Sequence, residues 1–301
     1  MLDRDQYTAL CEARIFEPAS LQRALRDRSR RTLAGDDGNL LILAADHTAR
    51  GMIAVGSDPL AVADRYELLD RMLRGLSVPG VDGVMASADI LEELAWLGAL
   101  EGRVAIGTIN RGGIKGALWE LDDRITAYDP DHIASAGLDG GKLLLRIEFT
   151  DPGVARTIEM CGEVVTRLAD QGLACMVEPL PYLKDDQGRS FLDTRDEELI
   201  RVVAIASGLG SSSAYTWLKI PATPRMAEVA AATTMPILLL GGDPGDKAGE
   251  VIAGWEDAMR QPNVRGLIPG RALLYPHDGD VEGVVATAAR IVHGGTTGGT
   301  S

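Results

Sequence analysis

The sequence contains few cysteines, few aromatic residues and very few lysines. Its three cysteines are widely separated, without paired or metal-type spacing, and so sparse and odd a number is typical of a reducing compartment. Aromatic residues form 4% of the 301-residue chain, so the core must be built from the aliphatic side chains within its 46% hydrophobic fraction. Of the 30 basic residues only five are lysines: Lys115, Lys142, Lys184, Lys219 and Lys247.

Net positive charge and long apolar runs are lacking as well. The formal net charge of -14 disfavours a nucleic-acid partner, although a local cluster of Arg and Lys can still bind one phosphate group. No apolar run reaches the roughly 18 to 20 residues of a membrane span, and the opening MLDRDQYTAL lacks the apolar region of a signal peptide. We therefore expect a cytoplasmic protein with no nucleic-acid and no membrane partner.

Short apolar runs alternate with longer amphipathic segments from residue 40 onward. Each run has the length of a strand buried on both faces, and the eight runs span residues 40–46, 80–87, 103–110, 140–148, 174–180, 215–222, 235–242 and 264–271. Eight strand–helix repeats in roughly 250 residues predict a single (β/α)8 TIM barrel, here over residues 40–293. An open doubly wound sheet is the alternative, which is less favoured because no GxGxxG motif follows the first run.

The segments that flank the barrel are predicted from composition and capping signals. Residues 1–39, which include the basic stretch SLQRALRDRSRR, are expected to form a short helical extension over the barrel bottom. Residues 294–301 are expected to form a flexible tail. A Pro after Asp58 predicts a helix that starts there, and a second Asp-Pro pair predicts a helix over 151–172.

Two long loops are also expected. Residues 111–124 form an elaborated loop after the third run, and residues 181–194 follow the fifth run. The second loop is long enough to act as a lid, from which Lys184 or Arg189 could reach a carboxylate, a sulfonate or a second phosphate on a substrate.

Polar side chains late in several runs are predicted to converge on the barrel axis. Active sites of such barrels lie at the C-terminal ends of the strands, and side chains alternate across a strand. This alternation places Lys219, Glu178, and the pair Lys142 and Arg146 on inward faces, and Asp46 ends the first run. We expect Lys142 and Arg146 to contact a substrate there.

Lys219 interrupts the apolar run YTWLKIPA and has two interpretations. It can be a structural lysine that reaches the strand end or pairs with a carboxylate. Alternatively, apolar surroundings and a second cation favour the neutral amine, which can attack a carbonyl group.

The neighbouring acidic residues share this ambiguity. Glu178 and Asp46 either neutralise a basic neighbour or move protons during Schiff-base chemistry. His47, which follows Asp46, either packs at the barrel rim or contacts the substrate.

Glycines follow the last two predicted strands. Gly241 and Gly242 end the seventh run, and Gly270 and Arg271 end the eighth. A Gly-Gly pair alone is commonly a turn, but on neighbouring strands these features let backbone N–H groups and a guanidinium approach one phosphate group. No metal or other cofactor is expected, because the four histidines show neither HxH nor HExxH spacing.

The ordered motifs LILAADHTARG, GGKLLLRIEF, MVEPLPY, WLKIP, LLLGGD and GLIPGRALL resemble those of the class I aldolases of the DeoC, LacD and FbaB superfamily. The resemblance covers about residues 40–292, and it rests on the order and spacing of the motifs more than on any single motif. The Arg-rich, Lys-poor composition is similar to that of an actinobacterial branch.

The resemblance implies a role for each matching residue. Lys219 would form the Schiff base, Asp46 would lie in the active site, and Lys142 would contact the substrate. Glu178 would transfer protons, as in the tagatose-bisphosphate and sulfofructose-phosphate members. The glycines after the seventh strand and the Gly-Arg pair after the eighth would hold the phosphate.

One motif departs from the archaeal fructose-bisphosphate members. They carry a tyrosine in the strand-five motif, where this chain has Leu180, with Tyr182 two residues further on. The departure favours a branch that uses the glutamate.

The activity that the resemblance implies is reversible cleavage of a small phosphorylated ketose to dihydroxyacetone phosphate and an aldehyde. Candidate substrates are 2-deoxy-5-keto-gluconate 6-phosphate of inositol breakdown, a tagatose or fructose bisphosphate, and a sulfofructose phosphate. Related aldolases are commonly homo-oligomers. Two alternatives are thiolase-like acyl transfer with the same lysine, marked by coenzyme A dependence, and a non-catalytic phosphosugar-binding protein, marked by ligand stabilisation without turnover.

Overall fold

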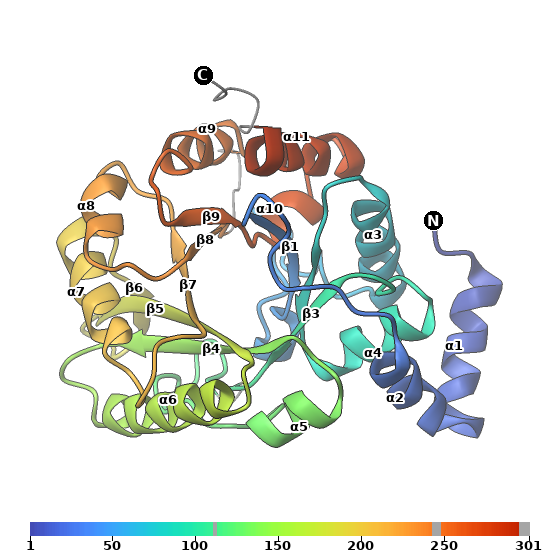
Figure 1. Ribbon diagram of the computed structural model, residues 1–301, viewed down its shortest axis with the longest axis horizontal. Coiled ribbons are helices and arrows are strands. Elements are labelled where there is room, and N and C mark those ends of the chain that lie inside the picture. The colour runs from blue at the N-terminus through green and yellow to red at the C-terminus, as the bar shows by residue number, and fades with distance from the viewer. Residues whose placement is uncertain (111–112, 243–247, 295–301) are drawn as a thin grey trace.

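Eight parallel strands close into a ring in the computed structural model, which describes residues 1–110, 113–242 and 248–294 (Figure 1). Around the ring the order is β1, β2, β3, β4, β5, β7, β8 and β9, and β9 pairs with β1. This confirms the predicted (β/α)8 barrel. The strands span Leu40–Ala45 (β1), Gly83–Ala86 (β2), Val104–Thr108 (β3), Gly140–Ile147 (β4), Ala174–Lys184 (β5), Thr216–Pro221 (β7), Ile237–Leu240 (β8) and Val264–Leu267 (β9).

Each predicted apolar run coincides with one barrel strand, because a barrel strand is buried on both faces, and only β5 continues beyond its run. In β1, Leu40, Ile42 and Ala44 face the barrel interior and pack with apolar residues of other strands. The alternate residues Leu41 and Leu43 belong to the larger core between the ring and the helices. Both faces of the strand are therefore apolar, and the sequence shows a run rather than an alternation.

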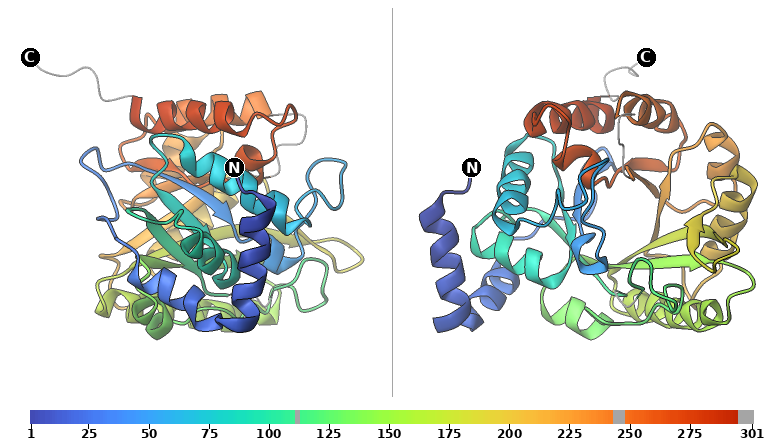
Figure 2. Two further views of the ribbon diagram at one scale, coloured as in Figure 1. Left: turned by 90° about the vertical axis from the view of Figure 1, so that its right-hand side faces the viewer. Right: turned by 180° about the vertical axis from the view of Figure 1, so that it is seen from behind.

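Helices surround the ring of strands in the views of Figures 1 and 2. They span Arg4–Phe16 (α1), Pro18–Asp27 (α2), Arg65–Ser77 (α3), Ala88–Trp96 (α4), Pro130–Ser135 (α5), Pro152–Asp170 (α6), Asp196–Ser207 (α7), Met226–Ala231 (α8), Ala248–Ala258 (α9), Arg271–Leu274 (α10) and Val281–His293 (α11), with a 3-10 turn at Thr48–Arg50 (η1).

The capping signals predicted one helix start correctly and one wrongly. Asp151 caps α6, since its carboxylate accepts a hydrogen bond from Gly153 N at 2.7 Å. The helix predicted from Asp58 begins instead after Asp64, whose side chain accepts from Glu67 N at 3.1 Å. The Asp58 carboxylate accepts from the backbone N–H of Leu60 and so closes a local turn.

The N-terminal extension is helical, as predicted, but its helices do not cover the barrel bottom. α2 packs against α4 outside the ring of strands (Figure 1). The segment that follows α2 reaches the N-terminal ends of the strands, where Arg28 pairs with Asp139 at 2.7 Å and Arg31 with Asp82 at 2.5 Å. Leu33 then packs against the barrel interior. The tail predicted at 294–301 lies outside the described residues except for Gly294, the C-cap of α11.

The loop predicted at 181–194 is a β-hairpin. β5 continues to Lys184 and pairs antiparallel with a short strand, β6 (Ser190–Leu192), with Tyr182 opposite Leu192. The turn between them is fixed by Asp185, whose carboxylate lies 2.7 Å from the Arg189 guanidinium. The hairpin extends from the C-terminal end of β5, where barrel active sites lie.

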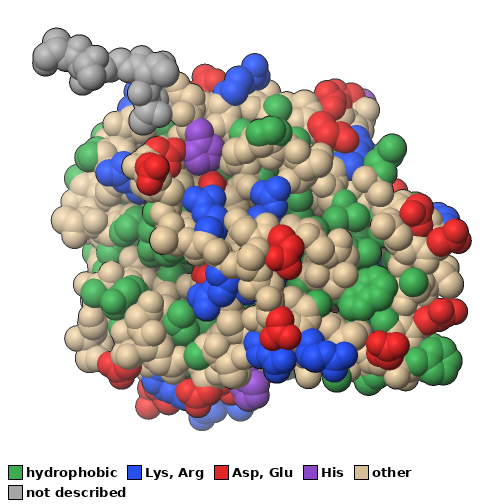
Figure 3. Space-filling model, turned by 45° about the vertical axis from the view of Figure 1, so that its right-hand side comes forward, with side chains coloured by type: hydrophobic (Ala, Val, Ile, Leu, Met, Phe, Trp, Pro, Cys, Tyr) green, Lys and Arg blue, Asp and Glu red, His purple; other side chains and the backbone are tan. Residues whose placement is uncertain are grey.

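On the face drawn in Figure 3, basic and acidic side chains are interspersed, with hydrophobic ones scattered among them. No helix in the described ranges has both the length and the apolar character needed to cross a membrane.

His293, the last residue of α11, ties the C-terminal helix to the barrel bottom. Its ring lies between two carboxylates: Nδ1 is 2.6 Å from Asp37 Oδ2 and Nε2 is 3.1 Å from Asp82 Oδ2. The hydrogen bond to Asp82 is the largest influence, and despite partial burial the two carboxylates raise the pKa of His293 to about 9. Protonated His293 therefore stabilises the folded state.

Replacing His293 with glutamine is expected to destabilise the protein in a pH-dependent way. The folded-state pKa is above the ordinary value of 6.5, so the stabilisation is complete below about pH 6.5 and is lost as the pH rises through about 9. Because the side chain is 26% exposed, we expect a loss of about 1 kcal/mol at pH 6 and almost none at pH 10. Urea unfolding of both proteins at the two pH values measures the difference.

His132→Gln is the matched control. His132 pairs with one aspartate, Asp129, rather than with two, and its side chain is 73% exposed, so its replacement should change the unfolding free energy little at either pH. An equal loss for His293→Gln at pH 6 and pH 10 would contradict the ion-pair explanation.

Candidate active site

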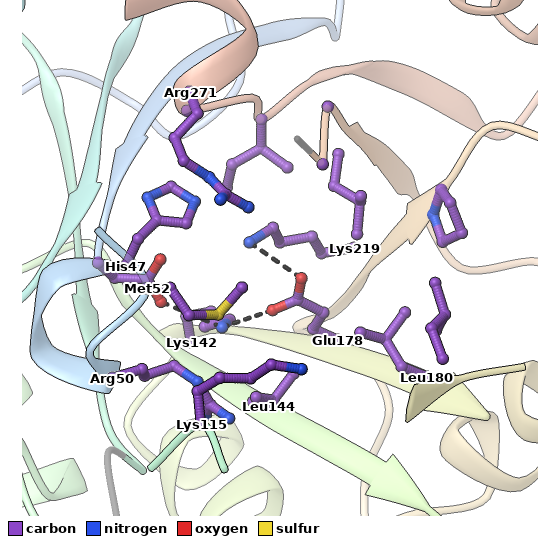
Figure 4. Close-up of a pocket in the computed structure, with 18 of the residues that line it drawn as sticks. His47, Arg50, Met52, Lys115, Lys142, Leu144, Glu178, Leu180, Lys219 and Arg271 are labelled. Atoms are coloured by element: carbon purple, nitrogen blue, oxygen red, sulfur yellow. Dashed lines mark hydrogen bonds and ion pairs between the residues drawn. The ribbon is translucent and has the colours of Figure 1, made fainter. Parts of the chain in front are cut away.

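Four ionisable side chains from four parts of the barrel lie in one chain of contacts at its C-terminal end (Figure 4). Lys219 Nζ on β7 lies 3.1 Å from Glu178 Oε1 on β5. The other oxygen, Oε2, lies 2.5 Å from Lys142 Nζ on β4. Lys142 Nζ in turn lies 3.2 Å from Oδ2 of Asp46, the residue after β1. The carboxylate of Glu178 thus bridges two lysines.

The strand register places these side chains at adjoining levels of the barrel. Met176 is aligned with Lys142 on one side and with Trp217 on the other, so Glu178 and Lys219 each lie one inward step above that level. The residues below them, which include Leu40 and Ile42, form the apolar interior. Lys142, Asp46, Glu178 and Lys219 are all buried, which explains why each has an ionic partner.

The two lysines keep Glu178 ionised. Burial by itself raises the pKa of this carboxyl group, but the positive charges of Lys142 and Lys219 outweigh burial and lower the pKa to about 2. Burial is also the main influence on His47, and together with nearby Arg271, Lys219 and Lys142 it lowers the imidazole pKa to about 4. At neutral pH the site therefore contains a charged carboxylate and an uncharged imidazole.

This arrangement is suited to proton transfer next to an amine. An ionised carboxylate in hydrogen-bonding distance of Lys219 Nζ can accept a proton from the ammonium, which leaves a nucleophilic amine. Lys142 lies against the second carboxylate oxygen of Glu178 and can stabilise this side chain both before and after it accepts the proton. The same carboxylate can return the proton to a leaving water or hydroxyl group.

A cavity of about 200 Å³ adjoins the lysines and the carboxylates. On the side of β8 and β9 it is lined by Gly241, Gly242, Gly270 and Arg271, which were predicted to bind phosphate. A Cβ atom on Gly270 would lie 2.2 Å from His47 Cε1 and 2.4 Å from the Ala44 carbonyl oxygen, so this position accepts no side chain without displacement. Arg271 is oriented in part by a 2.8 Å hydrogen bond from Nη1 to the carbonyl oxygen of Ala54.

The structure brings together nine of the ten predicted site residues in the lining of this cavity. They are Asp46, His47, Lys142, Glu178, Lys219, Gly241, Gly242, Gly270 and Arg271.

Arg146, predicted to contact the substrate, does not line the cavity. Its Nη1 lies 2.7 Å from Glu120 Oε1 and its Nη2 lies 3.5 Å from Asp123 Oδ2. Its guanidinium lies 5.6 Å from the centre of the Tyr182 ring. Arg146 faces the barrel axis by alternation, but these two carboxylates draw its long side chain toward the 113–124 segment.

The lid residues predicted to reach a substrate are also directed elsewhere. Lys184 Nζ lies 2.5 Å from Asp151 Oδ2, and Arg189 pairs with Asp185 within the hairpin turn. Neither lines the cavity.

Four further polar lining residues were not predicted from the sequence: Arg50, Lys115, Glu120 and Tyr182. Tyr182 could have been found, because it lies two inward steps beyond Glu178 on the extended β5. Lys115 could have been suspected because lysines are rare in this chain. Arg50 lies in η1, where no periodic pattern predicts its direction.

No group of three or more His, Cys, Asp or Glu side chains within residues 1–110, 113–242 and 248–294 is arranged to hold a metal ion. Metal independence stays a prediction, which chelation experiments test directly.

Comparison with known proteins gives a matching family model, a structural relative of high identity and more distant structural relatives. A family model described as Cgl0159-like matches residues 38–289. The crystal structure of Cgl0159 from Corynebacterium glutamicum is 44% identical, with a TM-score of 0.94, over 98% of this chain and 99% of that chain. No curated protein matches the sequence.

The distant relatives are aldolases that share the barrel fold. One is an archaeal fructose-1,6-bisphosphate aldolase with its catalytic lysine covalently bound to the carbinolamine intermediate of the substrate. It is 18% identical over 90% of this chain and 99% of the other, with a TM-score of 0.65. A fructose-bisphosphate aldolase from Slackia heliotrinireducens is 14% identical over 100% and 96% of the two chains, with a TM-score of 0.58.

Proposed function

The chain belongs to the Cgl0159-like family, and we propose that it is a class I aldolase in which Lys219 forms a Schiff base with the ketone of a phosphorylated sugar. The observation that carries this proposal is the 3.1 Å contact between Lys219 Nζ and Glu178 Oε1 inside the cavity. A binding protein has no need for a buried amine held against a carboxylate, whereas Schiff-base chemistry needs both.

The first half of the reaction joins Lys219 to the substrate. Glu178 accepts the ammonium proton of Lys219, and the free amine attacks the ketone carbon to give a carbinolamine. Glu178 returns the proton to the carbinolamine hydroxyl group, and water leaves as the protonated imine forms.

The second half breaks the carbon–carbon bond. A carboxylate, Glu178 with Asp46 as the second candidate, takes the proton of the hydroxyl group on the carbon beyond the bond that breaks. That hydroxyl becomes the carbonyl of the departing aldehyde, and the bonding electrons pass into the imine to give an enamine. Protonation of the enamine carbon and addition of water then release dihydroxyacetone phosphate and the free Lys219 amine.

The glycine side of the cavity supports a phosphorylated substrate. Gly241, Gly242 and Gly270 leave the backbone accessible, and Arg271 supplies a guanidinium that suits two-point contact with phosphate. In this proposal the phosphate lies against these residues while the ketone carbon faces Lys219.

Several phosphorylated ketoses fit this arrangement. The distant relatives are named as fructose-bisphosphate aldolases. The glycine and Arg271 side of the cavity would equally bind the phosphate of 2-deoxy-5-keto-gluconate 6-phosphate, a tagatose bisphosphate or a sulfofructose phosphate. Homo-oligomerisation and a cytoplasmic location stay predictions.

Reductive trapping tests the function. Incubation with dihydroxyacetone phosphate and sodium borohydride is expected to reduce the imine to a stable secondary amine, which peptide mass spectrometry should locate at Lys219. Glycerol 3-phosphate, which carries the phosphate but no ketone, is the matched control and should give no adduct. An adduct confined to another lysine, or turnover abolished by EDTA, would contradict the mechanism.

A further inference from the structure

The cationic side chains of the cavity lie on two sides of the catalytic lysine. Arg271 is seen on one side of Lys219 in Figure 4, and Arg50 and Lys115 are seen beyond Lys142 on the other side. Five Lys and Arg side chains and three carboxylates line the cavity, in a chain whose formal net charge is -14. The cavity is thus locally basic, and one phosphate beside Arg271 would leave the opposite side without an anion.

The segment that carries Lys115 is held in place by a buried ionic network. Asp123 lies 3.3 Å from the Arg50 guanidinium, and its Oδ1 accepts a hydrogen bond from Gly113 N at 3.0 Å. Glu120 pairs with Arg146, and its other oxygen accepts from Gly116 N at 2.9 Å. The four charged side chains of this network are buried, so the 113–124 segment is fixed next to the cavity.

The network occupies two carboxylates of the segment that carries Lys115, those of Glu120 and Asp123. The backbone N–H of Lys115 contacts the carbonyl oxygen of Arg50 at 3.3 Å, yet among the described residues its ammonium makes no ion pair. Lys115 is solvent-exposed and lines the cavity. Lys184, the comparable lysine of the hairpin, is held by Asp151 at 2.5 Å and does not line the cavity.

We propose that Lys115, with Arg50 behind it, binds a second anionic group of the substrate at the end opposite the phosphate held by Arg271. This inference rests on the proposed aldolase function. It assigns the substrate to sugars with two anionic ends, and it requires the released aldehyde to carry a phosphate, a carboxylate or a sulfonate. An ammonium on a flexible stem binds any of these groups, since it is a point charge rather than a planar fork.

The test uses the condensation direction, in which dihydroxyacetone phosphate is joined to an aldehyde acceptor. Three acceptors are compared: neutral glyceraldehyde, glyceraldehyde 3-phosphate, and succinic semialdehyde, which carries a carboxylate. The wild-type protein is expected to prefer an anionic acceptor. In Lys115→Gln, the ratio of kcat/KM for that acceptor over glyceraldehyde should fall about tenfold or more, chiefly through KM, as expected for loss of one charged hydrogen bond.

Lys184→Gln is the matched control, because it removes a lysine at the rim that lies outside the cavity. It should leave the acceptor ratio within about twofold of wild type. A loss specific to glyceraldehyde 3-phosphate identifies a phosphate, and a loss specific to succinic semialdehyde identifies a carboxylate.

Three results would overturn the assignment: a wild-type preference for glyceraldehyde, an unchanged ratio in Lys115→Gln, or an equal loss in Lys184→Gln. Reductive trapping with dihydroxyacetone phosphate, which has no second anionic group, separates this failure from failure of the aldolase proposal. Trapping at Lys219 with an unchanged ratio refutes the second subsite alone. Absence of trapping refutes the Schiff-base function itself.

Discussion

Lys219→Met is expected to lower kcat for ketose phosphate cleavage by about 10⁴-fold or more and to abolish reductive trapping. Methionine fills a similar volume but has no amine, so no covalent intermediate can form. Glu178 keeps its 2.5 Å contact with Lys142, so the variant should fold. Steady-state kinetics and intact-protein mass after borohydride treatment measure both effects.

Two further substitutions separate the nucleophile from its charge. Lys219→Arg keeps a cation beside Glu178 but offers no amine nucleophile, so it should be as inactive as the methionine variant. Lys142→Met removes the other buried lysine and should slow the reaction while trapping at Lys219 persists. Turnover by Lys219→Met within tenfold of wild type would remove Lys219 from the mechanism.

Glu178→Gln is expected to lower kcat by about 10² to 10⁴-fold, the usual range for loss of a general acid–base group. The amide has nearly the shape of the carboxylate, but it cannot accept a proton from Lys219, and it leaves two buried lysines with less negative charge between them. Borohydride trapping quenched at successive times should show slower formation of the Lys219 adduct. Circular dichroism should verify that the variant is folded.

The difference in pH dependence between wild type and this variant follows from the low pKa of Glu178, a group that the variant lacks. The folded-state pKa is about 2, below the ordinary 4.5, so the carboxylate stabilises the fold above about pH 4.5, and this stabilisation is lost as the pH falls through about 2. The activity gap between wild type and Glu178→Gln should therefore stay constant from pH 5 to pH 9.

Asp46→Asn is the comparison that identifies the principal proton-transfer group. Asp46 lies 3.2 Å from Lys142, whereas Glu178 contacts both lysines, so we expect the smaller loss of kcat from Asp46→Asn. A larger loss in Asp46→Asn than in Glu178→Gln would assign the proton transfers to Asp46.

The barrel could be predicted because its strands are buried on two faces and therefore appear as apolar runs. The interior half of the site followed from the same pattern, since alternation within a strand fixes the inward direction of Lys142, Glu178 and Lys219. No comparable rule governs the segments between strands. The start of α3 was missed because Asp58 and Asp64 both resemble N-caps, and only tertiary packing selects the second.

The outer half of the site depends on such segments. Arg50 and Lys115 enter the cavity because Asp123 and Glu120 hold the 113–124 segment against β4, and this pairing is between residues far apart in sequence. Arg146 was misassigned for the same reason: its inward position on β4 was right, but the partners that turn its side chain aside were invisible in the sequence.

Among the strands of the ring, β9 is joined to its neighbours by the fewest aligned residue pairs. This strand pairs with β1 through Leu40–Gly266 and Leu41–Leu267, and with β8 through two pairs separated by a register shift. β4 and β5, by contrast, are aligned over eight consecutive pairs. Backbone amides of β9 should therefore exchange with solvent through openings that cost less free energy than those of β4 and β5. The residues that follow β1, β8 and β9 line one cavity. A ligand that contacts all three segments would therefore stabilise the pairing of β9 with its neighbours, and ligand binding should slow hydrogen exchange in β9.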